Sequence, residues 1–400
     1  MADIPATSSA DTPRWGARTL LLALFPLLLL GGLLGFLVVS GSGLGARTAP
    51  PIEELTIDRV SLPVPERMVI EVTNGGPDAV TVSQVIVDDA YWQFAITPGA
   101  TIPRLGRATI TTNYPWVQDE RHAILVMTNT GVTFAGAVEV ATLAPAPTVA
   151  TVWQYALLGI YVGFIPVGLG LLWYPFLRRL GRTGMQAVLA LTVGLLLFLL
   201  FDTIDSALGI IATTAGAFGG APLVFLVALL TFGGLLAVGA RGKGQSNTRL
   251  SLAYRIALGI GLHNLGEGLA IGAAFALGQA ALGTFLVIGF TLHNITEGIG
   301  IAAPIARERP RLWDFIALAA LAGLPAVLGV WIGGFVYNSL AAAVFLALGA
   351  GAIAQVIYEV GRMVWRQSRE DDRPALSFAT FSGLAAGILI MYATALLVAA

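Results

Sequence analysis

Residues 251–277 (SLAYRIALGIGLHNLGEGLAIGAAFAL) and residues 280–305 (AALGTFLVIGFTLHNITEGIGIAAPI) are two neighbouring apolar segments that carry the same polar motif. The pattern H-N-[LI]-x-E-G-[LI]-x-I begins at His263 and again at His293. About 20 apolar residues span the hydrocarbon core of a bilayer as a helix, so each segment is long enough to cross one. A short turn joins the segments, and the sequence therefore predicts two antiparallel helices whose motifs meet near the middle of a membrane.

The rest of the chain is comparably apolar. Hydrophobic residues make up 56% of the 400 residues and charged residues 11%, whereas soluble proteins are about 25% charged. With a formal net charge of −1, this composition excludes an ordinary cytosolic enzyme, a disordered protein and a nucleic-acid binder. The 48 glycines are typical of closely packed membrane helices. The chain has no cysteine, which excludes disulfides and thiolate metal sites.

Apolar stretches of sufficient length recur along most of the chain. Together they predict an all-α polytopic membrane protein, with one N-terminal transmembrane helix and eight further helices. The predicted spans are 19–40, 152–176, 184–208, 220–240, 251–277, 280–305, 312–336, 339–362 and 376–399.

Residues 45–148 depart from this pattern. They alternate apolar and polar residues, as in Met68-Val69-Ile70-Glu71-Val72, and turn signals such as Asn74-Gly75-Gly76-Pro77 separate the alternating stretches. About seven short strands in roughly 100 residues are typical of a β-sandwich. The predicted domains are a cytoplasmic N-terminus and anchor (1–44), an extracytoplasmic β-sandwich-like domain (45–148) and an eight-helix membrane domain (149–400).

The positions of Lys and Arg predict the orientation. Outside the β segment, these residues lie before the first span, after the second, and between the fourth and fifth, sixth and seventh, and eighth and ninth spans. These positions share one side, which the positive-inside rule makes cytoplasmic. The sequence thus predicts a multi-pass protein of the inner or plasma membrane, with the β segment and C-terminus outside. A cleaved signal peptide is the alternative for the first span, whose long apolar core favours a retained anchor.

Helix geometry brings ligand-type side chains of the two motifs together. Residues four apart lie on the same helix face, so each histidine stacks with the glutamate of its own motif. The asparagine that follows each histidine lies about 100° around the helix and adds an oxygen ligand. The predicted metal ligands are His263, Asn264 and Glu267 on one helix and His293, Asn294 and Glu297 on the other.

Two neutral imidazoles and two carboxylates form a site that suits a divalent cation. Mixed nitrogen and oxygen ligands suit Zn²⁺, Fe²⁺, Mn²⁺ or Co²⁺, and ligand chemistry alone does not decide among them. Zinc is the first expectation, and no organic cofactor is expected. The alternative is that these side chains only hydrogen-bond neighbouring helices. Placing an ionisable side chain within a membrane costs free energy. The occurrence of the same His and Glu motif twice at one depth therefore favours the metal site. Under both interpretations, Gly268 and Gly298 let the two helices pack closely.

The two H-N-x-x-E-G helices resemble the fourth and fifth transmembrane helices of the ZIP (Zrt/Irt-like) metal transporters, particularly the ZupT and GufA-type branch. The resemblance covers about residues 152–400, which would be the eight helices of that family. It implies movement of divalent metal towards the cytoplasm by an elevator-like shift of one helix bundle against another, and a homodimer. It also implies that the histidines and glutamates of both motifs are metal ligands, and that the asparagines contribute to a second, adjacent metal site.

The sequence departs from the family pattern in three places. Gly266 and Thr296 occupy positions where the family often has proline, so flexibility replaces a fixed kink. Residues 321–325 lack the glutamate that some members carry on their sixth helix, which favours one main metal site over two. The loop 241–250 is short and lacks a histidine-rich tract.

Three other acidic residues lie near the ends of predicted spans. Asp202 and Asp205 lie near the outer end of the third span, three apart and so on one helix face. They are interpreted either as a hydrated helix end or as side chains that attract metal at an entrance, and the sequence leaves both open. Glu359, near the inner end of the eighth span, resembles a family position on the exit route.

The β segment shows no metal-binding pattern of its own. His122 is predicted to be a solitary surface histidine. Asp88-Asp89 and Asp119-Glu120 are expected to be solvated turns. The segment is interpreted as an interaction module for an extracytoplasmic partner, or as a cover for the outer metal entrance. The residues predicted to lie in its core include Tyr91, Trp92, Phe94 and Trp116.

Together these features predict a divalent-metal transporter rather than an enzyme. No P-loop is present in the sequence, so direct coupling to nucleotide hydrolysis is not supported. A membrane metalloenzyme that uses a metal-bound water is one alternative, and a metal sensor or receptor is another. The expected partners are metal ions, membrane lipid and a second copy of the chain, with no nucleic acid.

Overall fold

The computed structural model describes residues 17–39, 51–241, 249–336, 338–370, 374 and 376–399, and divides the chain into two units, Met1–Pro51 and Ile52–Ala400. In the first unit, helix α1 (Ala17–Val39) contains Pro26. Its apolar part, Leu24–Leu37, is shorter than the helices of the second unit that could cross a membrane. The N-terminal span therefore stays a prediction, and residues 1–16 and 40–50 lie outside the described residues.

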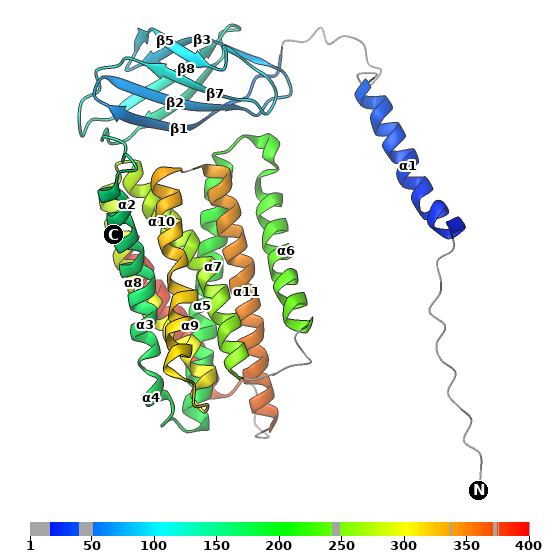
Figure 1. Cartoon of the computed structure of the whole chain (residues 1–400), viewed down its shortest axis with the longest axis vertical. Helices are drawn as coiled ribbons and strands as arrows, with labels where there is room; N and C mark the ends of the chain where they lie inside the picture. The colour runs from blue at the N-terminus through cyan, green and yellow to red at the C-terminus, as the bar shows by residue number, and fades with distance from the viewer. Residues whose placement is uncertain are drawn as a thin grey trace. The chain divides into compact units, whose positions relative to one another are not determined.

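The β region of the second unit consists of two sheets (Figure 1). The first sheet has the strand order β1-β2-β7-β5; the second has the order β4-β3-β8-β9, with β6 paired to β3. Neighbouring strands are antiparallel throughout. The strands are β1 (Leu55–Val64), β2 (Arg67–Asn74), β3 (Val80–Val87), β4 (Ala90–Trp92), β5 (Phe94–Thr97), β6 (Thr101–Ile102), β7 (Arg107–Thr112), β8 (His122–Thr128) and β9 (Thr133–Val138).

The two sheets share one hydrophobic core, as expected for a sandwich. Met68 and Ile110 of the first sheet and Val85 and Ile124 of the second belong to the same buried cluster. Alternate residues of a strand point to opposite faces, which explains why the apolar positions of the sequence pattern are the buried ones. Among the predicted core aromatic residues, Trp92, Phe94 and Trp116 pack against this cluster.

The prediction for Tyr91 was wrong, because this side chain is 67% exposed. Tyr91 and Trp92 are consecutive residues of the short strand β4, so they point to opposite faces. Trp92 takes the core side, which leaves Tyr91 on the solvent side.

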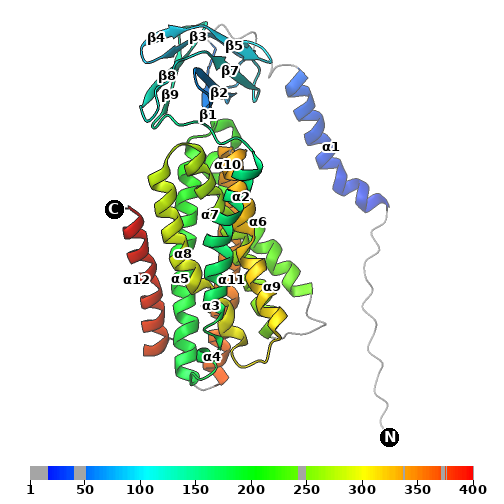
Figure 2. The same ribbon diagram turned by 60° about the vertical axis from the view of Figure 1, so that its left-hand side comes forward.

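Eight helical segments of the second unit are long and apolar enough to cross a membrane (Figures 1 and 2). Each coincides with one of the predicted spans from 152–176 onward. Two of the segments are interrupted, since a π-helical turn, η2 (Ile160–Phe164), divides the first and a break at Leu324 divides the sixth. The helices are α2 (Val149–Gly159), α3 (Ile165–Leu171), α4 (Tyr174–Leu177), α5 (Arg182–Ala212), α6 (Gly220–Arg241), α7 (Arg249–Ala276), α8 (Ala280–Ile305), α9 (Leu312–Gly323), α10 (Pro325–Phe335), α11 (Ser339–Glu370) and α12 (Phe378–Ala399).

The long helices pack as two bundles. The first bundle consists of α2, α3, α7, α8, α9 and α10. Within it, α7 packs on α8 and α9 and most extensively on α10. In addition, α3 packs on α8, and α2 packs on α10. In the second bundle (α5, α6, α11 and α12), α5 packs on α11 and α12, and α11 packs on α6; Figure 2 shows α12 beside α5. The bundles meet where α7 lies against α11 and where α8 lies against α5 and α12.

Glycines bring helix backbones into contact within each bundle. A Cβ atom on Gly170 of α3 would lie 2.0 Å from a carbonyl oxygen of α8, and one on Gly194 of α5 would lie 2.2 Å from a carbonyl oxygen of α12. Across the interface between the bundles, the nearest backbone approach of a described glycine is 3.2 Å, as from Gly349 to the Cα atom of His263. Backbones therefore interlock within each bundle, whereas side chains separate the two bundles.

Two prolines interrupt the first bundle close to the motif helices. Pro166 has no N–H, so the carbonyl group of Val162, four residues earlier, lacks its normal helix donor. Pro325 begins α10 after the break, which leaves Ala322 in the last turn of α9, where carbonyl groups lack partners within their own helix. The helices α7 and α8 run unbroken through their motifs, with Gly266 and Thr296 in regular helix.

Candidate metal centre

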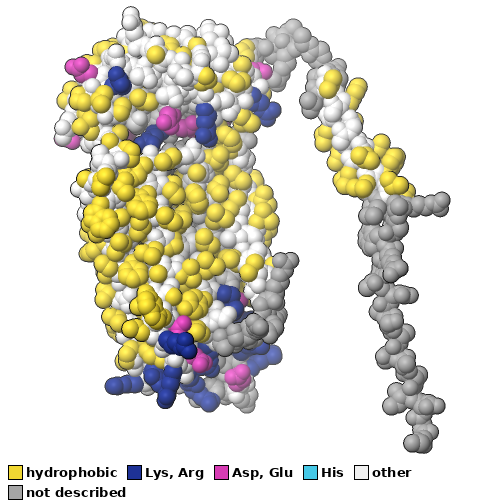
Figure 3. Space-filling model, in the orientation of Figure 1, with side chains coloured by type: hydrophobic (Ala, Val, Ile, Leu, Met, Phe, Trp, Pro, Cys, Tyr) yellow, Lys and Arg dark blue, Asp and Glu magenta, His cyan; other side chains and the backbone are white. Residues whose placement is uncertain are grey.

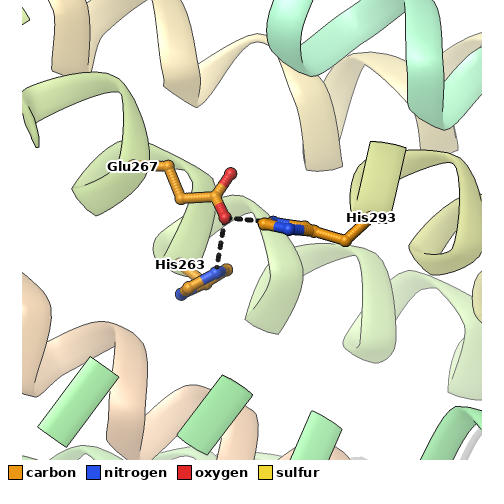
Figure 4. A group of neighbouring side chains, drawn as sticks. All are labelled: His263, Glu267 and His293. Carbon is orange, nitrogen blue, oxygen red and sulfur yellow. Dashed lines mark hydrogen bonds and ion pairs between the residues drawn. The ribbon is translucent and has the colours of Figure 1, made fainter. Parts of the chain in front are cut away.

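Three buried side chains converge near the middle of α7 and α8. His263 and Glu267 of α7 and His293 of α8 are 4%, 3% and 6% exposed. The Nε2 atom of His263 lies 3.0 Å from Oε1 of Glu267, and Nε2 of His293 contacts the same oxygen (Figure 4). One ligand atom from each of these residues lies within 4.8 Å of the other two. These three residues, here called the triad, are close enough to bind one ion.

The asparagines of the two motifs are held through their amide nitrogens. Nδ2 of Asn294 donates to the carbonyl oxygen of Val162 at 3.0 Å and to Oε2 of Glu267 at 3.2 Å. Nδ2 of Asn264 donates to the carbonyl oxygen of Ala322 at 3.0 Å. Both carbonyl groups lie where a proline disturbs the neighbouring helix, so these irregularities supply the acceptors that fix the two amides.

Several oxygen atoms on the same two helices are buried without a hydrogen-bond partner among the described residues. They are Oδ1 of Asn264, Oδ1 of Asn294 and both carboxylate oxygens of Glu297. An unpaired buried polar atom costs about 1–3 kcal/mol, and more when it is charged. A cation would satisfy such oxygens, whereas hydrogen bonding between helices accounts only for the amide nitrogens. The residues present therefore fit a bound cation.

Glu297 is the predicted main ligand that does not join the triad. The group of mutually close ligand atoms in the described residues contains only the other three. Because α7 and α8 are antiparallel, the step of about 6 Å from each histidine to its glutamate runs in opposite directions on the two helices. Glu267 consequently lies level with His293, and Glu297, one helical turn farther along α8, lies level with His263. The separation of Glu297 from the triad therefore comes from the rotation of α8 and not from its depth.

A cavity of about 660 Å³ reaches the triad from one side. Asp202 and Thr203 of α5 line it together with the three triad residues. The other residues that line the cavity lie towards the end of the bundle where α5 and α12 end and α8 begins. The cavity therefore occupies one half of the bundle. These other lining residues include Phe198, Gly209, Ile210, Leu282, Leu286, Phe290, Met391, Thr394 and Ala395.

The acidic residues predicted along a metal pathway take different positions. Asp202 and Asp205 are both exposed, but only Asp202 lines the cavity. Glu359 of α11 forms an ion pair with Arg255 of α7, with Nε and Oε1 3.5 Å apart, and it also accepts a hydrogen bond from Gln355 at 3.4 Å. Glu359 therefore links the second bundle to the first, at the opposite end of α7 from the cavity.

Gly268 and Gly298 lie at close helix contacts, but not with each other's helix. A Cβ atom on Gly268 would lie 2.1 Å from the carbonyl oxygen of Ala326 in α10, and one on Gly298 would lie 2.2 Å from that of Val167 in α3. The expectation that they bring α7 and α8 together was therefore wrong. Each glycine instead fixes its helix to another helix of the first bundle.

In the β region, His122 is 2% exposed, so its prediction as a surface residue was wrong. Its Nδ1 lies 2.7 Å from Oδ2 of Asp88, and its Nε2 accepts a hydrogen bond from the Val117 N–H at 3.2 Å. The sequence did contain a signal for burial. His122 shares a strand face with Ile124, because the two residues are two apart in β8, and Ile124 is fully buried. With both ring nitrogens engaged, His122 has a structural role.

Asp88 belongs to the same network and is not simply a solvated turn residue. Burial acts to raise the pKa of Asp88, but hydrogen bonds from Tyr114, His122 and the Ala123 N–H lower it overall. Burial and the contact with Asp88 raise the pKa of Tyr114 to about 12. At neutral pH, Asp88 is therefore charged and Tyr114 is protonated. Asp88 lies in the turn after β3, and its hydrogen bonds join this turn to β8 and to Tyr114, which lies between β7 and β8.

Sequence reasoning missed Thr203, whose Oγ1 lies 3.4 Å from Nδ1 of His263. Threonine is common in apolar helices, so the sequence offers no signal that distinguishes this residue. No protein-family model and no curated protein sequence matches the chain.

Proposed function

We propose that the protein moves divalent transition-metal ions across a membrane. The observation that carries this proposal is the buried triad of His263, Glu267 and His293, which a one-sided cavity reaches inside a bundle of eight apolar helical segments. Ionisable side chains at such a depth are costly unless they serve an ion pathway or an equivalent function. The resemblance of both motifs to the ZIP transporters supports the same proposal.

The metal is the substrate in this proposal. Two imidazole nitrogens and a carboxylate oxygen suit Zn²⁺ and also accept Fe²⁺, Mn²⁺ or Co²⁺. The unpaired oxygens of Asn264, Asn294 and Glu297 lie next to the triad in sequence and supply further oxygen ligands on the same helices. We assign one main metal site to the triad. The unpaired oxygens are then ligands of the position that an ion occupies next along its path through the bundle.

Movement of the first bundle against the second gives the ion access to the other side. The triad belongs entirely to the first bundle, and the cavity lies between this bundle and α5, α11 and α12 of the second. Backbone contacts at glycines tie the helices of each bundle together, whereas side chains separate the two bundles. This arrangement supports an elevator-like exchange between two access states around one site.

Charge supports an orientation for this movement. Figure 3 shows Lys and Arg side chains gathered at the end of the bundle where α4 lies, below a broad apolar flank. The positive-inside rule assigns that end to the cytoplasmic side of an inner or plasma membrane. The cavity then faces outward with Asp202 in its wall, and the ion pair of Arg255 and Glu359 closes the cytoplasmic side.

Metal uptake into proteoliposomes tests the proposal. The purified full chain should move at least one of Zn²⁺, Fe²⁺, Mn²⁺ and Co²⁺. His293→Ala should lower that uptake by about 100-fold or more, because even supporting residues of metal sites contribute 10–100-fold to affinity. Glu308→Gln, at an exposed carboxylate outside the cavity, should keep the parent rate. A parent protein that binds metal but moves none would favour a sensor or a metalloenzyme instead.

A further inference from the structure

The hydroxyl group of Thr203 has an unusual partner for a threonine in these helices. Thr192, Thr231 and Thr291 each donate to the carbonyl oxygen four residues earlier in their own helix, at 3.1, 2.8 and 2.6 Å. This is the usual bond of a helical threonine. Thr203 is 3% exposed, and its only hydrogen-bond partner among the described residues is Nδ1 of His263, on another helix.

The chemistry of this pair suits a metal-binding histidine. A neutral imidazole has one nitrogen that carries a proton and one with a free lone pair. Metal binding through Nε2, which faces Glu267, requires the proton on Nδ1. A hydroxyl group both donates and accepts, so Thr203 can accept from Nδ1–H when Nε2 binds metal and donate to Nδ1 when Nε2 is protonated.

The bond also crosses the interface between the two bundles. Thr203 lies on α5 of the second bundle, and His263 lies on α7 of the first. The only interaction of Thr203 with the triad therefore depends on how the bundles are placed. Asp202, the preceding residue, lines the same cavity, so this segment of α5 forms the wall that faces the triad.

We infer that Thr203 is a positioning residue that holds the His263 ring with Nε2 towards Glu267 only while the bundles keep the arrangement seen here, so that their movement lowers the affinity of the site and releases the metal. This inference rests on the proposed transport function. It adds the reason why an ion held tightly in one access state leaves in the other. Loss of such a supporting hydrogen bond typically lowers metal affinity by about 10–100-fold.

Metal titration of the purified full chain tests the positioning role, with Co²⁺ and Zn²⁺ as probes. Thr203→Val keeps the side-chain shape and removes the hydroxyl, and it should raise Kd by about tenfold or more. Thr203→Ser keeps the hydroxyl and should restore binding and the Co²⁺ absorption bands of the parent. Thr192→Val is the matched control, because Thr192 is similarly buried on α5 and its hydroxyl, among the residues that the structure describes, bonds only its own helix. Its Kd should equal that of the parent.

A reversible cross-link tests the dependence on bundle position. A Cβ atom on Gly300 of α8 would lie 3.7 Å from Cβ of Thr192 on α5, the separation found in disulfides. Thr192→Cys combined with Gly300→Cys, in a chain that has no other cysteine, should fix the bundles in this arrangement when oxidised. Oxidation should then tighten Co²⁺ binding in the presence of Thr203 and leave Kd unchanged when Thr203→Val is added.

Three results would overturn the inference. They are an unchanged Kd in Thr203→Val, an equal loss of affinity in Thr192→Val, and an oxidation effect that is the same with and without Thr203. Absence of flux in the parent protein is a different result, since it contradicts the proposed function while the titrations still report the role of Thr203.

Discussion

Glu267 is the residue on which the metal centre depends most. One of its carboxylate oxygens contacts Nε2 of both His263 and His293, and the other accepts a hydrogen bond from Asn294. Its side chain is 3% exposed and lies in the wall of the cavity. This oxygen lies against two imidazole nitrogens from different helices, at the point where a cation would bind.

Replacing this carboxylate should therefore abolish tight metal binding. Glu267→Gln keeps the shape of the side chain but removes the charge, and we expect Kd for Zn²⁺ to rise by at least about 100-fold, more than loss of a supporting residue produces. Calorimetric titration of the purified protein measures this effect. Glu308→Gln serves as the charge-matched control, and equal affinities in the two variants would remove Glu267 from the site.

Asp88 should make the stability of the β region depend on pH. Its pKa is lower in the folded state than its usual value of about 3.9, so its contribution to stability is fully present above that value. The contribution is lost as the pH falls through the lower, folded pKa. Asp88→Asn should therefore unfold at a lower temperature at neutral pH, and the difference from the parent should shrink in acid. A thermal melt recorded across this pH range checks both effects, and a constant difference would contradict the assignment.

At the scale of elements, the irregular first helical segment is part of the site. Pro166 cannot donate to the carbonyl oxygen of Val162, and that oxygen accepts the hydrogen bond from Asn294 instead. The sequence predicts this segment as one uninterrupted span, because hydropathy responds to composition and not to the loss of a single N–H group.

Restoring the missing donor should weaken the site while repairing the helix. In Pro166→Ala, the new N–H competes with Asn294 for the carbonyl oxygen of Val162. Loss of a hydrogen bond worth about 1 kcal/mol corresponds to roughly a fivefold higher Kd for the metal. Pro304→Ala, in the last turn of α8, should bind metal like the parent. Equal affinities in both variants would show that the proline break does not position Asn294.

The sequence predicted the elements better than their contacts. Apolar length located the eight helical segments, and alternation located the strands, because both depend on local pattern. The i, i+4 rule also identified all three triad residues. It could not show that Glu297 lies apart, that Thr203 faces His263, or that Gly268 packs on α10. Those facts depend on helix rotation and neighbours, which side-chain packing of the whole chain decides.

At the scale of the whole molecule, the two-bundle arrangement makes a prediction about transport. The disulfide formed by Thr192→Cys with Gly300→Cys joins α5 to α8, and thus the second bundle to the first. Oxidation should lower Zn²⁺ uptake into proteoliposomes by at least about tenfold while the protein still binds metal, and reduction should restore uptake. Thr192→Cys alone serves as the control, because Gly300→Cys alone would place a Cβ atom 2.6 Å from Cγ2 of Thr192. Full uptake by the oxidised protein would show that the bundles do not move against each other.

The central claim is that the buried triad carries metal through the bundle. The most direct test is the initial rate of Zn²⁺ uptake into proteoliposomes that contain a trapped zinc indicator, compared between the parent protein and Glu267→Gln reconstituted at equal density. The account predicts saturable uptake by the parent and a rate no greater than that of protein-free liposomes for Glu267→Gln. Equal uptake by both proteins, or none above the protein-free rate by the parent with any of the four metals, would contradict it.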